Sequence, residues 1–146
     1  MIIGIDPDID KVGFCRIFDG TILELKSLDM CSLISQVPIL IDEGYEFAIE
    51  NVSANNAVFG KYSKAEQYKK VARSKSVGKV QAAHQIIKRW VEYNNGIVID
   101  VPAGVGKQVK KNAKLFNQLS GWTKRSNQDM RDAWAIAKWA LIKENK

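Results

Sequence analysis

Two short apolar runs, each ending in a carboxylate, constrain most strongly how this chain of 146 residues can fold. Residues 1–6 (MIIGID) and 45–51 (YEFAIEN) predict buried strands. Between them, residues 29–44 carry apolar side chains at helical spacing. Because a helix that connects two strands of one sheet joins parallel strands, we expect the two runs to be parallel neighbours. Asp6 and Glu50 then lie at the same edge of the sheet.

The remaining pattern predicts a mixed α/β fold. Residues 12–18 and 21–26 are bounded by turn signals, so together with the first run they predict an antiparallel meander. The later elements that we expect are a helix over 63–93 with a break near 74–78, a strand over 96–102, and helices over 107–119 and 127–143. The order βββαβαβα indicates one domain over residues 1–146. Its core is a five-stranded mixed sheet, a three-strand meander plus two parallel strands, flanked by helices.

Charge is distributed unevenly along the chain, which carries a formal net charge of +6. Residues 1–50 hold 10 acidic and 3 basic residues, whereas residues 60–92 hold 9 basic and 2 acidic ones. Residues 103–146 hold 10 basic and 3 acidic residues. This pattern indicates carboxylates gathered at one site and cations spread over a surface that binds a polyanion such as nucleic acid. Charge scattered over a solvated surface is the alternative.

Four carboxylates are candidates for one metal site. Asp6 and Glu50 end the two parallel strands, and ligand sites in open α/β sheets form beyond such ends. Asp129 and Asp132 share one face at the start of the last helix, where the helix dipole is the simpler explanation for them. Carboxylates without histidine or cysteine suit Mg²⁺ or Mn²⁺. Because two such ions hydrolyse phosphodiesters in line, the four acids predict a two-metal nuclease.

These motifs follow one another in an order that resembles the RuvC family of Holliday junction resolvases, which have the ribonuclease H-like fold. The resemblance rests on GIDPD (4–8) followed by Val12 and Gly13, on AIE (48–50), on GKVQA (78–82) and on DMRDAWAIA (129–137). It implies that the four carboxylates are the metal-binding catalytic acids. It also implies a homodimer that cuts four-way DNA junctions by paired symmetric nicks.

The same resemblance implies further residues that contact DNA. A basic residue after the fifth strand often assists catalysis in such enzymes, and Lys107 is the candidate. Bacterial members place an aromatic side chain shortly after the second acid. This chain has Ser53 and Ala54 there, so Phe59 or Tyr62 is the substitute, unless Phe59 packs under its loop. The charge pattern adds the basic residues of 61–79, where Glu66 is the single acid. The candidate DNA-binding residues are Phe59, Lys61, Tyr62, Lys64, Lys69, Lys70, Arg73, Lys75, Lys79, Lys110 and Lys111. The chain is more similar to phage or viral members than to bacterial ones.

Two other functions remain open at the level of sequence. One is a module that binds branched DNA without cutting it. The other is an actin-like nucleotide-binding domain, because a first strand ending in GID also opens that fold. The chain has no stretch near 18 uninterrupted apolar residues and no secretory signal pattern. We therefore expect a cytoplasmic protein of a bacterial or phage-infected cell, with no membrane partner and no small-molecule cofactor.

Overall fold

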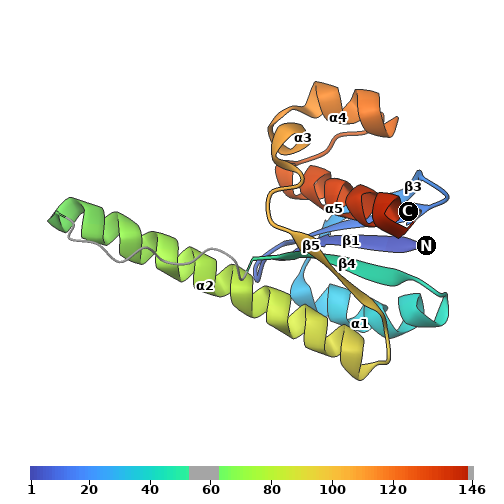
Figure 1. Ribbon diagram of the computed structural model, residues 1–146, viewed down its shortest axis with the longest axis horizontal. Coiled ribbons are helices and arrows are strands. Elements are labelled where there is room, and N and C mark those ends of the chain that lie inside the picture. The colour runs from blue at the N-terminus through green and yellow to red at the C-terminus, as the bar shows by residue number, and fades with distance from the viewer. Residues whose placement is uncertain (53–62, 145–146) are drawn as a thin grey trace.

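The computed structural model describes residues 1–52 and 63–144, which form a five-stranded sheet with helices on both faces (Figure 1). The strands are β1 (Ile2–Asp6), β2 (Val12–Phe18), β3 (Thr21–Leu28), β4 (Glu46–Asn51) and β5 (Val98–Pro102). The helices are α1 (Met30–Asp42), α2 (Lys64–Tyr93), α3 (Lys107–Lys111), α4 (Ala113–Ser120) and α5 (Gln128–Glu144). The element order is the one that the sequence predicts, apart from one helix that is divided in two.

The sheet has the strand order β3-β2-β1-β4-β5. Strands β1, β2 and β3 form the expected antiparallel meander, and β1, β4 and β5 are parallel. The predicted fold class is therefore confirmed. The register pairs Ile5 of β1 with Ile49 of β4, so Asp6 and Glu50 each follow the last residues that pair between these strands. Both acids thus lie at the carboxyl edge of the sheet, where parallel strands end together.

The two faces of the sheet build two separate cores. Ile2 and Ala48 belong to the core under α5, whereas Ile3, Ile49 and their neighbours pack against α1 and α2. Because side chains alternate along a strand, Asp6 shares the face of Ile2, and Glu50 shares the face of Ala48. Both carboxylates therefore face α5, which also carries the other two candidate acids.

Helix α5 approaches β1 unusually closely at Gly4. A Cβ atom at this position would overlap the carbonyl oxygen of Ala133 and would lie 2.7 Å from the Cβ atom of Ala137. Ala133, Ile136 and Ala137 are fully buried against the sheet. The small residues on both elements let the helix lie directly on the central strand, which sets the height of its first turn above Asp6.

Two helices differ from the sequence expectation. The break expected near 74–78 is absent, because α2 is continuous across Gly78, which is exposed with nothing within 4 Å of a Cβ atom there. A single glycine costs only about 1 kcal/mol in a helix. The helix expected over 107–119 is two helices, α3 and α4, divided at Asn112. The backbone of Asn112 is extended, and its side chain accepts the N–H of Leu115 at 3.0 Å, which caps α4.

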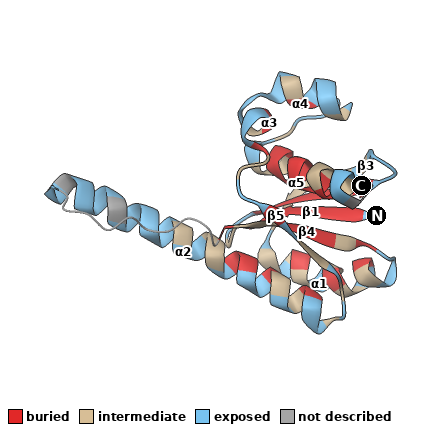
Figure 2. Ribbon diagram, in the orientation of Figure 1, coloured by how far each residue is buried: buried red, intermediate tan, exposed pale blue. Residues whose placement is uncertain are grey.

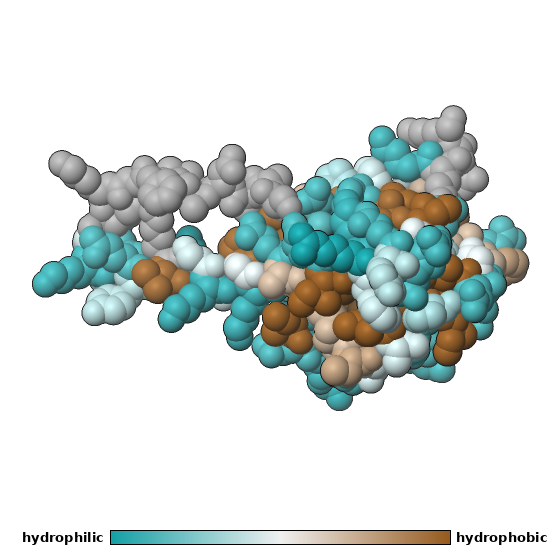
Figure 3. Space-filling model, turned by 90° about the horizontal axis from the view of Figure 1, so that it is seen from below, coloured by the Kyte–Doolittle hydropathy of each residue, from teal (hydrophilic) through white to brown (hydrophobic). Residues whose placement is uncertain are grey.

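The outer half of α2 projects away from the sheet. Burial along this helix begins only at Ala83, and the described side chains before it are half-buried or exposed (Figure 2). Seen from the α1 and α2 side, the projecting part carries mostly hydrophilic side chains (Figure 3). No helix among the described residues is both long and apolar enough to cross a membrane.

Gly4→Ala tests the close contact between α5 and β1. We expect it to lower the free energy of unfolding by about 1–3 kcal/mol, because the added methyl group must push the helix off the strand. Urea unfolding followed by circular dichroism measures this change. Gly78→Ala is the control, and we expect it to be stabilising by about 0.5–1 kcal/mol because that position is exposed and helical. A Gly4→Ala protein as stable as the unaltered chain would contradict the contact.

Candidate metal centre

Three carboxylates from three elements converge where β1 and β4 end. Asp6 comes from β1, Glu50 from β4 and Asp132 from the second turn of α5. One carboxylate oxygen of each lies within 4.8 Å of those of the other two. Asp6 and Asp132 are buried, with 9% and 4% of their surface exposed, and Glu50 is half-buried. We call these three residues the acid cluster.

Small residues make room for the acid cluster. A Cβ atom at Gly106 would overlap the Asp132 carboxylate, and one at Gly13 would overlap the backbone carbonyl of Asp129. The start of α5 is fixed by Asn127, whose side-chain oxygen accepts the N–H of Met130 at 2.8 Å. The same amide donates to the Ser27 hydroxyl of β3 at 2.9 Å. The start of α5, before Asp132, is therefore held against β2 and β3.

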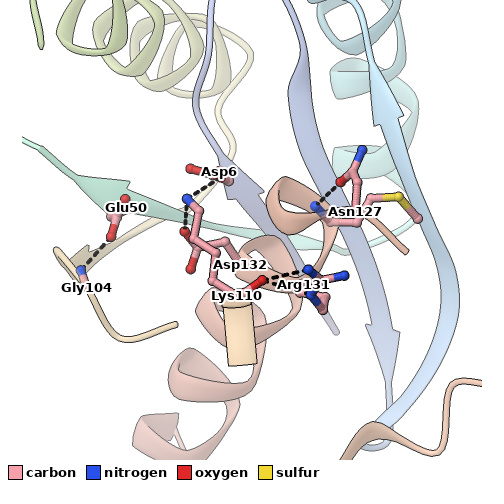
Figure 4. A network of polar contacts seen from close by, with 8 residues as sticks. Asp6, Glu50, Gly104, Lys110, Asn127, Arg131 and Asp132 are labelled. Carbon is pink, nitrogen blue, oxygen red and sulfur yellow. Dashed lines mark hydrogen bonds and ion pairs between the residues drawn. The ribbon is translucent and has the colours of Figure 1, made fainter. Parts of the chain in front are cut away.

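Glu50 is oriented by the loop between β5 and α3. The backbone N–H of Gly104 donates to Glu50 Oε1 at 2.6 Å (Figure 4). Gly104 has a φ of 85°, which favours glycine. A Cβ atom at Gly104 would also lie 3.3 Å from the amino group of Lys107. This loop thus holds the Glu50 carboxylate in place, and the Lys107 side chain lies next to Gly104.

The Lys110 ammonium lies between two of the carboxylates. Its Nζ atom is 2.6 Å from Asp132 Oδ2 and 3.5 Å from Asp6 Oδ2 (Figure 4). Burial opposes the charge of Lys110, but the hydrogen bond to Asp132 and the charges of Asp6 and Asp132 outweigh it and hold the pKa of Lys110 above its usual value. The acid cluster therefore already attracts and holds a cation.

One lysine does not neutralise the acid cluster. Burial raises the pKa of Asp6 to about 7; the Lys110 ammonium lowers it, while the carboxylates of Asp132, Glu50 and Asp129 raise it further. Strong perturbation of a carboxyl pKa by burial and like charges is typical of functional sites. Additional positive charge at this place would favour the ionised form of Asp6, and three hard carboxylate donors suit Mg²⁺ or Mn²⁺.

The structure separates the predicted site residues into three groups. Asp6, Glu50 and Asp132 come together, as described above. Asp129 is half-buried one turn earlier on α5 and acts on the pKa of Asp6 and of Lys110 through its charge. Lys107 is exposed beside Gly104, whereas Lys110, a candidate for DNA contacts, is the lysine on the acid cluster.

The candidate DNA-binding residues lie mainly on the projecting part of α2. Four of them are exposed there: Lys64, Lys69, Arg73 and Lys75. The Nζ atom of Lys79 lies 3.8 Å from Oδ2 of Asp10. Lys111 is exposed on α3. Phe59, Lys61 and Tyr62 lie outside the described residues, as does the side chain of Lys70. The described cations thus form a basic surface on the projecting part of α2, whose side chains are not buried in the core.

Sequence reasoning assigned no role to Arg131, which lies between the two acids of α5. Its guanidinium is buried and donates to the backbone carbonyls of Lys110 and Ser126. The only signal in the sequence is that an arginine stands between the two acids of DMRDAWAIA, directly before the apolar residues of the helix.

Comparison with known proteins identifies structures of similar fold. No protein-family model matches the chain, and no curated protein matches it. Solved structures do match, and they are similar to this chain in fold. Thermus thermophilus RuvC in complex with a Holliday junction substrate is 16% identical, with a TM-score of 0.61, and the alignment covers 99% of this chain and 94% of that one.

A second structure of Thermus thermophilus RuvC is 14% identical, with a TM-score of 0.57, and the alignment covers 99% of this chain and 95% of that one. The chain therefore has a RuvC-like fold over nearly its whole length, as the sequence resemblance predicts.

Asp6→Asn tests the electrostatics of the acid cluster without any assay of activity. The raised pKa means that the folded protein holds a proton on Asp6 that the unfolded chain has lost, so stability falls as the pH rises from about 4 to about 7. Asparagine does not ionise, so the variant does not lose this stability as the pH rises. With metal removed by a chelator, we expect Asp6→Asn to gain stability relative to the unaltered chain between pH 4 and pH 8, by up to about 4 kcal/mol.

Urea unfolding at pH 4 and at pH 8 measures the stability difference between Asp6→Asn and the unaltered chain. Asp42→Asn, at an exposed site on α1, is the control. Adding Mg²⁺ at pH 8 supplies a second comparison. We expect it to stabilise the unaltered chain by binding to the folded state, and to stabilise Asp6→Asn less. A stability difference that does not change with pH would contradict the burial of an ionisable Asp6 in the acid cluster.

Proposed function

We propose that this chain is a metal-dependent, structure-selective DNA endonuclease that resolves four-way junctions by paired symmetric nicks. The observation that carries the proposal is the convergence of Asp6, Glu50 and Asp132 at the carboxyl edge of a RuvC-like sheet. One of the matching structures is a RuvC in complex with a Holliday junction substrate. In this proposal, residues 1–146 act as a single nuclease domain.

The acid cluster, joined by Asp129, is the proposed ligand set for two Mg²⁺ or Mn²⁺ ions. Ions bound there would supply the charge that activates water and stabilises the leaving oxygen of a phosphodiester. Asp6 is central because it lies beside both Asp132 and Glu50. The Gly104 N–H fixes the direction of Glu50, so this carboxylate needs little reorganisation to bind an ion.

Two lysines near the acid cluster have proposed roles toward the phosphate. Lys107 is the first residue of α3, next to the loop that holds Glu50, and it is exposed, so its ammonium is free to approach a phosphate bound over the cluster. Lys110 lies deeper, on Asp132 and Asp6. Each would offset negative charge that builds on the phosphate during hydrolysis.

The projecting part of α2 is the proposed surface for the DNA arms. Its exposed cations are suited to phosphates, which give affinity and salt dependence without a choice of sequence. A homodimer completes the proposal, because a two-fold symmetric enzyme matches the symmetry of a four-way junction and places two active sites for paired nicks.

One observation favours a second function, binding of branched DNA without cleavage. Lys110 already forms ion pairs with Asp132 and Asp6, and a lysine that stays there would keep a divalent cation out. The assay that follows separates the two functions, because a module of this kind would bind the junction and leave it intact with any metal ion.

Labelled four-way, three-way and linear duplex DNA, each incubated with and without Mg²⁺ or Mn²⁺, test the proposed function directly. We expect nicks at symmetric positions in the four-way substrate and only with metal present. Asp6→Asn is expected to lower the cleavage rate by more than about 10³-fold, because it removes a central charged ligand, and to leave junction binding intact. Gel-shift measurements on the same substrates report binding.

The matched control is Asp42→Asn, which removes an exposed carboxylate at the end of α1, before β4 begins, whereas the acid cluster lies where β4 ends. It should cut like the unaltered chain. Undiminished cutting by Asp6→Asn would contradict the role of the acid cluster. Equal digestion of all three DNA forms would reduce the proposal to a general nuclease.

A further inference from the structure

We propose that Arg131 is a positioning residue: it fixes helix α3 so that the Lys110 ammonium occupies the cation position of the acid cluster, from which a divalent cation displaces it. The inference rests on the metal site of the proposed function and adds two things to it. It assigns a role to a buried arginine, and it makes the lysine an exchangeable internal cation.

Arg131 makes an unusual set of contacts for a buried charge. Only 7% of the residue is exposed. Its Nε and Nη2 atoms both donate to the carbonyl oxygen of Lys110, at 2.9 and 2.7 Å (Figure 4). Its Nη1 atom donates to the carbonyl and the hydroxyl oxygen of Ser126, at 2.8 and 3.3 Å. These acceptors are all uncharged, so the guanidinium acts here as a rigid fork on backbone rather than in an ion pair.

Helix α3 needs such an anchor. It has five residues, and its N-cap, Gly106, makes no side-chain capping bond. Its C-cap, Asn112, has an extended backbone and is also the N-cap of α4. A helix this short has no stability of its own. Val109 is buried, and the two bonds from Arg131 to the Lys110 carbonyl tie to α5 the backbone from which the Lys110 side chain extends.

The Lys110 ammonium and a divalent cation would compete for the same oxygens. Lys110 Nζ lies on Asp132 Oδ2 and near Asp6 Oδ2, and both residues belong to the acid cluster. About a third of the Lys110 side chain is exposed (32%), so its flexible chain has a way out to solvent. The two hydrogen bonds from Arg131 hold the backbone of Lys110, so only the lysine side chain has to move. A bound metal ion would then leave the Lys110 ammonium near the acid cluster, on its solvent side.

Lysine acylation with mass-spectrometric readout tests both parts without an activity assay. The unaltered chain is labelled with metal removed and again with Mg²⁺. Lys114, which is exposed on α4, is the internal reference. Without metal we expect Lys110 to react about tenfold more slowly than Lys114, because its amine is held in charge-assisted hydrogen bonds. With Mg²⁺ we expect the Lys110 rate to approach that of Lys114.

Variants test the positioning role of Arg131. Arg131→Lys keeps the charge and loses the fork, so Lys110 should react several-fold faster without metal. Arg125→Lys, at an exposed arginine of the connection before α5, is the matched control and should leave the Lys110 rate unchanged. Arg131→Gln is the second variant, in case the first does not fold. The effect of Mg²⁺ on the unaltered chain needs no variant.

Mn²⁺ affinity, measured from the spin-resonance signal of free Mn²⁺, separates positioning from a merely structural role. Lys110→Met should tighten Mn²⁺ binding about tenfold, and Arg131→Lys should tighten it by a smaller factor. In a chain that already carries Lys110→Met, Arg131→Lys should have no further effect. A merely structural Arg131 would lower thermal stability in both backgrounds and would not tighten Mn²⁺ binding in either.

Three results would overturn the inference: Lys110 reacting as fast as Lys114 without metal, no response of Lys110 to Mg²⁺, or no change of its rate in the Arg131 variants. Failure of the proposed function looks different. In that case the labelling pattern holds and no junction is cut. Conversely, symmetric cutting of junctions by a chain whose Lys110 ignores Mg²⁺ would reject the inference alone.

Discussion

The direct packing of α5 on the central strand is the contact on which the site depends. Gly4 has no side chain, and the carbonyl of Ala133 and the side chain of Ala137 take its place. This contact sets where the first turns of α5 lie above the end of β1. As a result, Asp132 reaches Asp6, although the two are far apart in the sequence. The apolar core on this face thus determines the geometry of the polar cluster at its edge.

The same packing makes the acid cluster electrostatically unfavourable by itself. Burial and the neighbouring carboxylates raise the pKa of Asp6, and one lysine, Lys110, offsets part of this negative charge. The chain therefore carries a site with more negative charge than its own cations offset. Such a site gives up some stability of the empty fold and gains affinity for added positive charge, as is common at functional centres.

Much of this arrangement follows from the sequence, and the physical reasons show where prediction stops. Parallel strands that each end in an acid fix the meeting of Asp6 and Glu50, because the crossover rule leaves little choice of topology. The choice between Lys107 and Lys110 is different: they are three residues apart, and which one reaches the acids depends on where α3 begins. Asn112 divides the expected helix by capping α4, and the role of Arg131 depends on backbone carbonyls that no side-chain pattern reveals.

Diffraction from crystals soaked in Mn²⁺, with data collected at the manganese absorption edge, tests the central claim most directly. We expect anomalous density among the carboxylates of Asp6, Glu50 and Asp132, with the Lys110 ammonium moved away from Asp132. Density for the ion elsewhere, or an acid cluster that keeps Lys110 on Asp132 at saturating Mn²⁺, would contradict it.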